Sequence, residues 1–146
     1  MQDLNLPKYS FKIKNEDGKI FIFDCIRKKY LYLSPEEWVR QNFIMYLKEE
    51  KGYPSSLIAV EMTIDLLNTK KRCDIVLFNI YGEPNIIVEC KSPKVNISRR
   101  TFDQISRYNM SLKTDMIIVT NGLEHYFCRI DHKNKCYNFL KDIPNY

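Results

Sequence analysis

Three ionisable residues of the kind used in metal-assisted hydrolysis lie beside apolar stretches of this sequence. Glu89 and Lys91 flank Cys90 directly after the strand-like run Ile86 to Val88. Residues two apart on a strand point to the same face, so the carboxylate and the ammonium should share one. Charged side chains are seldom buried unless they are paired or bound to an ion. The pattern therefore indicates either a structural ion pair or a site that binds a cation and an anion.

A second carboxylate, Asp74, is predicted to lie beside Glu89. The stretches 73–80 and 86–91 are both apolar, and YGEPN between them is a turn signal, which predicts an antiparallel hairpin. If the turn centres between Tyr81 and Gly82, Asp74 stands opposite Glu89. A slip of one residue would move Asp74 off that face, so the prediction depends on the register.

Two carboxylates and a lysine at one end of a sheet suit a hard divalent cation. Mg²⁺ prefers oxygen ligands, often one or two carboxylates completed by water and phosphate oxygens. The ion would relieve the repulsion between Asp74 and Glu89, and Cys90 could add its backbone carbonyl while its side chain enters the core. Lys91 could orient water or stabilise charge on a phosphate.

Length and composition indicate one globular domain over residues 1–146. The chain has 45% hydrophobic and 28% charged residues and a net charge of +5, which is ordinary for a folded protein and permits an anionic partner. Its five cysteines are odd in number and form no C-x-x-C pair, which favours free thiols and a reducing cytoplasm. No apolar run is long enough to span a membrane.

The predicted elements alternate between strands and helices. Ser34 is a good N-cap for a helix over 35–50, and its spacing from Glu37 matches a capping box. Ser98 could cap a second helix over 98–113, and NTKKR (68–72) is interpreted as a polar turn. The remaining predictions are a hairpin over about 11–26 and strands over 58–67, 73–80, 86–91, 116–120, 125–130 and 136–140. This order predicts an α/β (α+β) domain with a central mixed sheet flanked by helices.

Several segments together resemble a known family. Asp74 followed by Glu89-Cys90-Lys91 resembles the PD-(D/E)XK nucleases, whose motif is an acidic residue and then E-x-K on the next strand. The chain also resembles the N-terminal nuclease domain of type I restriction enzyme R subunits, and its short stand-alone members in particular. The resemblance covers about residues 20–131 and is carried by SPEEWVRQ (34–41), KGYP (51–54), VEMTIDL (60–66), RCDIVLF (72–78), IIVECKSPKV (86–95), DQISRYN (103–109) and IIVTNG (117–122).

The resemblance implies a restriction-endonuclease-like fold, with its nuclease core over about 34–131, and a role for each matching residue. Asp74 and Glu89 would hold the metal and Lys91 would be the catalytic lysine. An acidic residue of the first helix often completes the site. Glu36 is slightly favoured over Glu37, because Glu37 is the better partner for Ser34. This chain carries Cys73 where many members have a proline.

Further residues are candidates for contact with DNA. Gln104 and Tyr108 match a Q-x-x-x-Y element of related nucleases, one turn apart on the second helix. Other candidates are cationic, although charge clusters are also common on plain solvated surfaces: Lys70, Lys71, Arg72, Arg99, Arg100 and Arg107. Arg99 and Arg100 open a helix, where the dipole disfavours cations, and phosphate binding would explain that placement.

The expected function is Mg²⁺-dependent hydrolysis of phosphodiester bonds in DNA, with Mn²⁺ able to substitute. Two alternatives remain open: a module of the same fold that binds nucleic acid without cutting it, and an accessory subunit. The sequence contains no G-x-x-x-x-G-K-[ST] loop, so we expect either independent action, alone or as a homodimer, or a partner subunit with a motor or specificity function.

Overall fold

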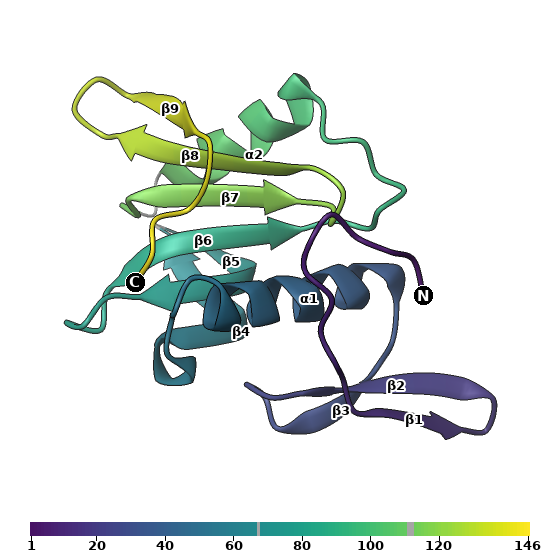
Figure 1. Ribbon diagram of the computed structural model, residues 1–146. Coiled ribbons are helices and arrows are strands. Elements are labelled where there is room, and N and C mark those ends of the chain that lie inside the picture. The colour runs from purple at the N-terminus through teal and green to yellow at the C-terminus, as the bar shows by residue number, and fades with distance from the viewer. Residues whose placement is uncertain (67, 111–112) are drawn as a thin grey trace.

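A mixed six-stranded sheet forms the centre of the computed structural model, which describes residues 1–66, 68–110 and 113–146 (Figure 1). Its strands neighbour one another in chain order, and only β6 and β7 are parallel. This arrangement confirms the predicted mixed sheet. The strands are β4 (Ile58–Leu66), β5 (Thr69–Phe78), β6 (Pro84–Cys90), β7 (Met116–Thr120), β8 (His125–Asp131) and β9 (Cys136–Leu140).

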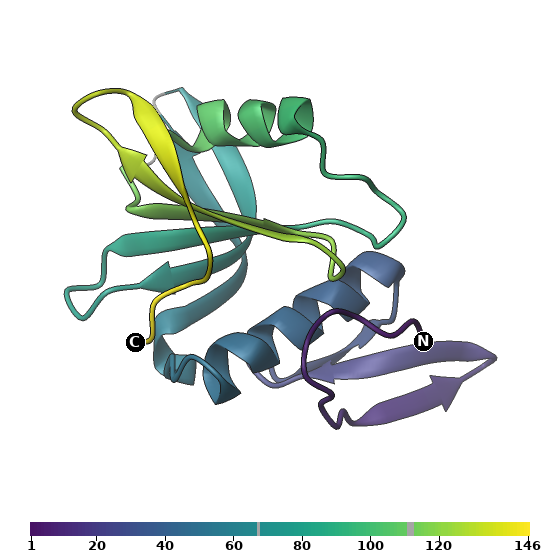
Figure 2. The same ribbon diagram turned by 45° about the horizontal axis from the view of Figure 1, so that its top comes forward.

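One helix covers each face of this sheet, as Figure 2 shows: α1 (Pro35–Glu49) and α2 (Arg99–Met110). The fully buried face of α1 is the predicted one and carries Val39, Phe43 and Leu47. On the other side, Phe102 of α2 packs with Ile117 and Val119 of β7. A short 3₁₀ helix, Ser55–Leu57, precedes β4. No helix among the described residues is long and apolar enough to cross a bilayer.

Both predicted N-caps are present, but the capping box is incomplete. The hydroxyl of Ser34 accepts a hydrogen bond from the Glu37 amide at 3.1 Å, and Ser98 does the same for Thr101 at 3.1 Å. The Glu37 carboxylate does not return to Ser34. It is drawn instead to two arginines, because charged hydrogen bonds are stronger than one to a neutral amide.

The predicted register between β5 and β6 is confirmed. Ile75 pairs with Val88 and Leu77 with Ile86, so one more step along the hairpin places Asp74 across from Glu89. The predicted ends of β5 were wrong. The strand begins at Thr69, which pairs with Leu66, so most of NTKKR is strand rather than turn. Sequence periodicity missed this segment because its side chains are polar where the two strands extend past the apolar core.

A small second sheet lies on the other side of α1 from the main sheet (Figures 1 and 2). It consists of β1 (Ile13–Glu16), β2 (Lys19–Asp24) and β3 (Lys29–Tyr32), so the predicted hairpin gains a third strand. Phe11 packs edge-on against Trp38 of α1, with ring centroids 5.3 Å apart. This contact shows that the face of the small sheet on the side of Phe11 packs against α1.

Asp24 fastens the small sheet to α1 from a fully buried position. Its Oδ1 accepts the amides of Ile26 and Arg27, and its Oδ2 accepts Arg27 Nε at 2.5 Å and Gln41 Nε2 at 2.9 Å. Burial alone would raise the pKa of Asp24, but these hydrogen bonds together hold the pKa below its ordinary value of 3.8.

Replacing Asp24 should change how acid affects stability. Since its pKa is lower in the folded than in the unfolded chain, Asp24 contributes fully above pH 3.8, and the contribution is lost as pH falls through the folded pKa. We expect Asp24→Asn to cost about 1–3 kcal/mol at pH 7 and to flatten the acid dependence below pH 4. Urea unfolding across this pH range measures both effects.

Asp17→Asn is the matched control, because Asp17 is exposed in a turn with φ of 50°, a conformation that asparagine tolerates. It should unfold like the wild type at every pH. A parallel acid dependence in Asp24→Asn and wild type would show that Asp24 is not the titrating group.

Candidate active site

Asp74 lies where the alternation of β5 changes face. Cys73 packs in the cluster of Val76 and Ile87, whereas Ile75 faces α1, so two odd-numbered residues point to opposite sides. Glu61, which lies across from Asp74 in the β4–β5 register, has a positive φ of 55°. The local irregularity leaves Asp74 free to accept the Cys90 amide on its Oδ2 at 2.7 Å.

The guanidinium of Arg40 sits at the centre of a cluster of carboxylates. Its Nη2 lies 2.8 Å from Asp74, 2.8 Å from Glu61 and 3.2 Å from Glu36, and its Nη1 donates to Glu37. Burial alone would lower the pKa of Arg40, but the bond to Asp74 and the surrounding charges raise it above its ordinary value. Its side chain is only 6% exposed, so this charge depends on its acidic partners.

Arg40 and Glu61 were not among the site residues predicted from the sequence. A signal existed for Arg40, because it follows Glu36 and Glu37 by four and three residues and therefore shares a helix face with them. Glu61 had no comparable signal, since its position across from Asp74 depends on the pairing of β4 with β5.

Glu89 is buried at the end of β6 and lies 2.7 Å from the ammonium of Lys71. Burial raises the pKa of the Glu89 carboxyl, and the charge of Asp74 raises it further. Lys71 and Lys91 oppose these effects without cancelling them. Lys71, a predicted DNA contact, is therefore also the ion-pair partner of Glu89. The pKa is raised mainly because burial disfavours the charged carboxylate, and a cation bound beside Glu89 would favour that charged form.

Lys91 follows β6 directly and stays at the sheet edge because its amide donates to the Thr120 carbonyl at 2.8 Å. In the part of the chain that the structure describes, its ammonium has no hydrogen-bond or ion-pair partner. The pKa values of Glu36 and Glu89 are both raised, mainly by burial, and the nearby charge of Lys91 partly opposes this rise in each. It is a half-buried cation that remains available to a ligand.

The two candidate acids of α1 have different surroundings. Glu36 has a side chain 45% exposed, and burial together with the charge of Asp74 raises its pKa. Glu37 is buried between Arg27, Arg40 and Gln41. Glu36 therefore faces the carboxylates of the sheet, whereas Glu37 links α1 to the small sheet.

A groove of about 430 Å³ runs between α2 and the β4–β5 hairpin beside these residues. Gln104 also lines it, so the structure brings the predicted Gln104, Glu89 and Lys91 to one cavity. Its lining is mainly basic and polar: Lys70, Lys71, Arg72, Glu89, Lys91, Thr101, Gln104 and Ile105. Glu89 therefore lies in a groove whose other charged lining residues are cations, a surface that suits an anion.

The other predicted DNA contacts lie outside this lining. Arg99, Arg100 and Arg107 are exposed on α2. Arg72 does line the groove, and it also pairs with Glu61. The side chain of Tyr108 lies outside the described residues, as do that of Asn109 and all of Leu112 from the predicted apolar face of this helix.

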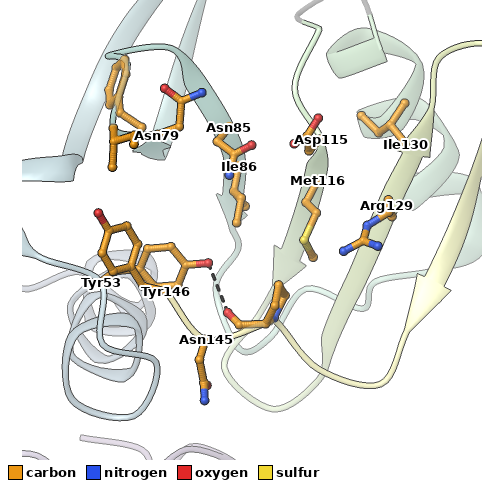
Figure 3. A pocket seen from close by; sticks show the side chains of 13 residues that line it. Tyr53, Asn79, Asn85, Ile86, Asp115, Met116, Arg129, Ile130, Asn145 and Tyr146 are labelled. Atoms are coloured by element: carbon orange, nitrogen blue, oxygen red, sulfur yellow. Dashed lines mark hydrogen bonds between the residues drawn. The ribbon is translucent and has the colours of Figure 1, made fainter.

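A second cavity, of about 590 Å³, opens at the opposite end of β6. Figure 3 shows Met116, Arg129 and Tyr146 among its lining side chains. Asn85 and Ile86, at the start of β6, also line it, whereas Glu89 stands at the end of that strand. This cavity is therefore separate from the acidic cluster.

Removing the Arg40 charge should destabilise the fold. Arg40→Gln would leave buried carboxylates without their shared cation, and we expect a loss of about 3–5 kcal/mol in unfolding free energy. Denaturant unfolding at pH 7 measures it.

Arg72→Ala is the control, because the Arg72 side chain is 69% exposed and its pair with Glu61 should contribute at most about 1 kcal/mol. If the two variants lost equal stability, Arg40 would not be the central charge of this cluster.

Comparison with known proteins agrees with this architecture. The family model for the type I restriction enzyme R protein N terminus (HSDR_N) matches residues 35–144. A solved fragment described as an HsdR subunit of a type I restriction enzyme from Vibrio vulnificus YJ016 has the same fold, with a TM-score of 0.53 and 19% identity. The match covers 77% of this chain and 24% of that one. No curated protein matches.

The family match includes α1, the hairpin that carries Asp74 and Glu89, and both sides of the groove. This chain therefore belongs to the family of type I restriction enzyme R protein N-terminal domains.

Proposed function

We propose that this chain is a metal-dependent nuclease domain that hydrolyses phosphodiester bonds in DNA. The observation that carries the proposal is that Glu89 and Lys91 line one basic groove, while the β5–β6 register places Asp74 across from Glu89. Structural ion pairs alone would not require a half-buried lysine without a partner among the described residues. A scissile phosphate would supply that partner.

The donor set fits a hard divalent cation, although it is not a preformed cage. Among residues 1–66, 68–110 and 113–146, no three His, Cys, Asp or Glu side chains are arranged to hold a metal. Mg²⁺ commonly takes only one or two carboxylates and keeps several waters. Asp74, Glu89 and the Cys90 carbonyl would hold it, with Glu36 acting directly or through water, and Mn²⁺ would substitute.

Individual residues of the chain would then have separate roles in hydrolysis. When bound, the ion supplies charge neutralisation and a lowered pKa of water. Lys91 would orient the attacking water or stabilise the charge that develops on the phosphate. Water adds to phosphorus, the bond to the 3′ oxygen breaks, and that oxygen takes a proton. Gln104, across the groove, would position the DNA or Lys91.

Basic residues around the groove would hold the DNA backbone. Lys70 and Arg72 line the groove itself, and Arg99, Arg100 and Arg107 extend the positive surface along α2. Contacts of this kind would be to phosphates and largely independent of base sequence. Binding should then weaken steeply as salt is added.

A second candidate, binding without cleavage, is favoured by one observation. Arg40 and Lys71 already form ion pairs with Asp74 and Glu89, the carboxylates that would hold the metal. A module that keeps these pairs would bind DNA through the groove as an accessory subunit. Since this chain spans only about a quarter of the fragment it resembles, partner subunits with motor or specificity functions belong to the same proposal.

Lys91→Ala tests the nuclease. Its ammonium has no partner among the described residues, so the fold should lose at most about 1 kcal/mol, whereas cleavage should fall by about 100-fold or more. Cleavage of single-stranded and duplex DNA with Mg²⁺ or Mn²⁺ measures activity, and thermal unfolding measures the fold.

The control is Lys94→Ala, because Lys94 is exposed three residues further along and does not line the groove. It should cut like the wild type. An unfolded Lys91→Ala protein would show that the lysine is structural, and wild type that binds but never cuts DNA would favour the accessory module.

Calorimetric titration with Mn²⁺ tests the metal site separately. Wild type should bind the ion, with DNA present if affinity is low, and Asp74→Asn should lose this binding because one carboxylate is gone. Asp65→Asn, at an exposed position on β4, should bind as wild type does. Equal Mn²⁺ binding by wild type and Asp74→Asn would remove Asp74 from the site.

A further inference from the structure

The outer face of the small sheet carries two rows of aromatic rings and lysines. The strand register places Lys14, Phe21 and Tyr32 in one row and Lys12, Phe23 and Tyr30 in the next. We call these six residues the aromatic–lysine face. The alternate residues Phe11, Ile22 and Asp24 point inward to α1, so this face is turned to solvent.

The rings of this face remain open although they contact one another. Tyr32 is 60% exposed and Tyr30 39% exposed, which is high for large aromatic residues. Phe21 and Tyr32 meet nearly at right angles, with an interplanar angle of 80°, and Phe23 and Tyr30 meet at 63°. Edge-on packing of this kind leaves part of a ring surface uncovered for a flat ligand.

Lysine ammonium groups cover part of these rings. Lys14 Nζ lies 4.8 Å from the centroid of Tyr30 and 5.5 Å from that of Phe21, and Lys12 Nζ lies 5.6 Å from that of Phe23. Exposed cation–π contacts are weak, so the flexible lysine side chains can leave the rings and bind an anion instead. A ligand with planar rings and regularly spaced negative charges could stack on the aromatic rings and bind the lysine ammonium groups at the same time.

The charges that face this surface are mainly positive. Lys12, Lys14 and Lys19 are on it, and Glu16 is at its edge, where its carboxylate lies 3.0 Å from Lys14. Both side chains of this ion pair are about half exposed, so the pair contributes little to stability. The net charge complements a polyanion rather than a neutral or basic partner.

We propose that the aromatic–lysine face binds single-stranded nucleic acid, with bases stacked on Phe21, Tyr30 and Tyr32 and phosphates held by Lys12 and Lys14. Every base has a planar face, so stacking tolerates any sequence, and lysines beside the rings can follow the backbone. Duplex DNA keeps its bases stacked inside the helix, so it can use only the lysines. This binding site is independent of the acidic cluster and does not rest on the proposed cleavage.

Fluorescence anisotropy with a labelled oligothymidylate of 20 nucleotides tests the proposal. The full chain is used in EDTA, so that no cleavage can occur. The double variant Tyr30→Ala/Tyr32→Ala should bind this strand about tenfold or more weakly, because alanine removes the stacking surface. Its affinity for a 20-base-pair duplex should not change.

Three further variants separate stacking from other effects. Tyr30→Phe/Tyr32→Phe keeps the rings and should bind like the wild type. Lys12→Ala/Lys14→Ala should weaken binding and lower the slope of log affinity against log salt by about 1.4. Tyr81→Ala removes a tyrosine that is 81% exposed in the β5–β6 turn, and it should have no effect.

The proposal fails if Tyr30→Ala/Tyr32→Ala binds oligothymidylate as wild type does, or if it loses equal affinity for duplex and single strand. It also fails if replacing these two tyrosines with alanine changes the sedimentation coefficient of the protein and leaves its DNA affinity unchanged. That result would make the face a contact between copies of the chain. Circular dichroism of each variant confirms that the small sheet is intact.

Discussion

The buried charge of Arg40 is the constraint on which the rest of this structure depends. A guanidinium that is almost wholly removed from water must be surrounded by acceptors, since leaving it unpaired would cost several kcal/mol. Four carboxylates from α1, β4 and β5 provide that environment. The same requirement fixes the helix against the sheet at the end where Asp74 and Glu89 stand.

The charge network continues from Arg40 to the small sheet. Glu37 binds both Arg40 and Arg27, and Arg27 binds the buried Asp24. The small sheet, α1 and the main sheet are therefore joined by one series of alternating charges that lies beside the apolar core. Apolar packing is non-directional and would allow α1 to slide. Directional, charged hydrogen bonds set its position along the sheet.

The same network explains how a folded protein accommodates a cluster of acids at one end of its sheet. Arg40 and Lys71 offset the repulsion between carboxylates, while burial, and to a lesser extent the charge of Asp74, keep the pKa of Glu89 raised. A divalent ion beside Glu89 would favour its charged form. Proteins often carry such unfavourable electrostatics at functional sites, and here the buried core on both faces of the sheet sustains it.

The sequence alone determined the local elements and the most important register. Alternating and helical apolar patterns located both helices and the strands β7 to β9, because burial imposes these periods on any chain. The short turn between β5 and β6 predicted the pairing that brings Asp74 opposite Glu89, and a register shift between Leu77 and Phe78 is part of how the hairpin reaches it. The family segments along the chain supplied the expected fold and the order of the site residues.

Only the tertiary structure decided which charges meet. The sequence could not show that Glu61 joins Arg40, that Lys71 neutralises Glu89, or that β3 completes an exposed aromatic face. Charged side chains carry no periodic signal of their own, and their partners are set by contacts between strands and helices far apart in the chain. The sequence therefore determined which groups are available for chemistry, and packing determined which are paired and which, like Lys91, face the groove.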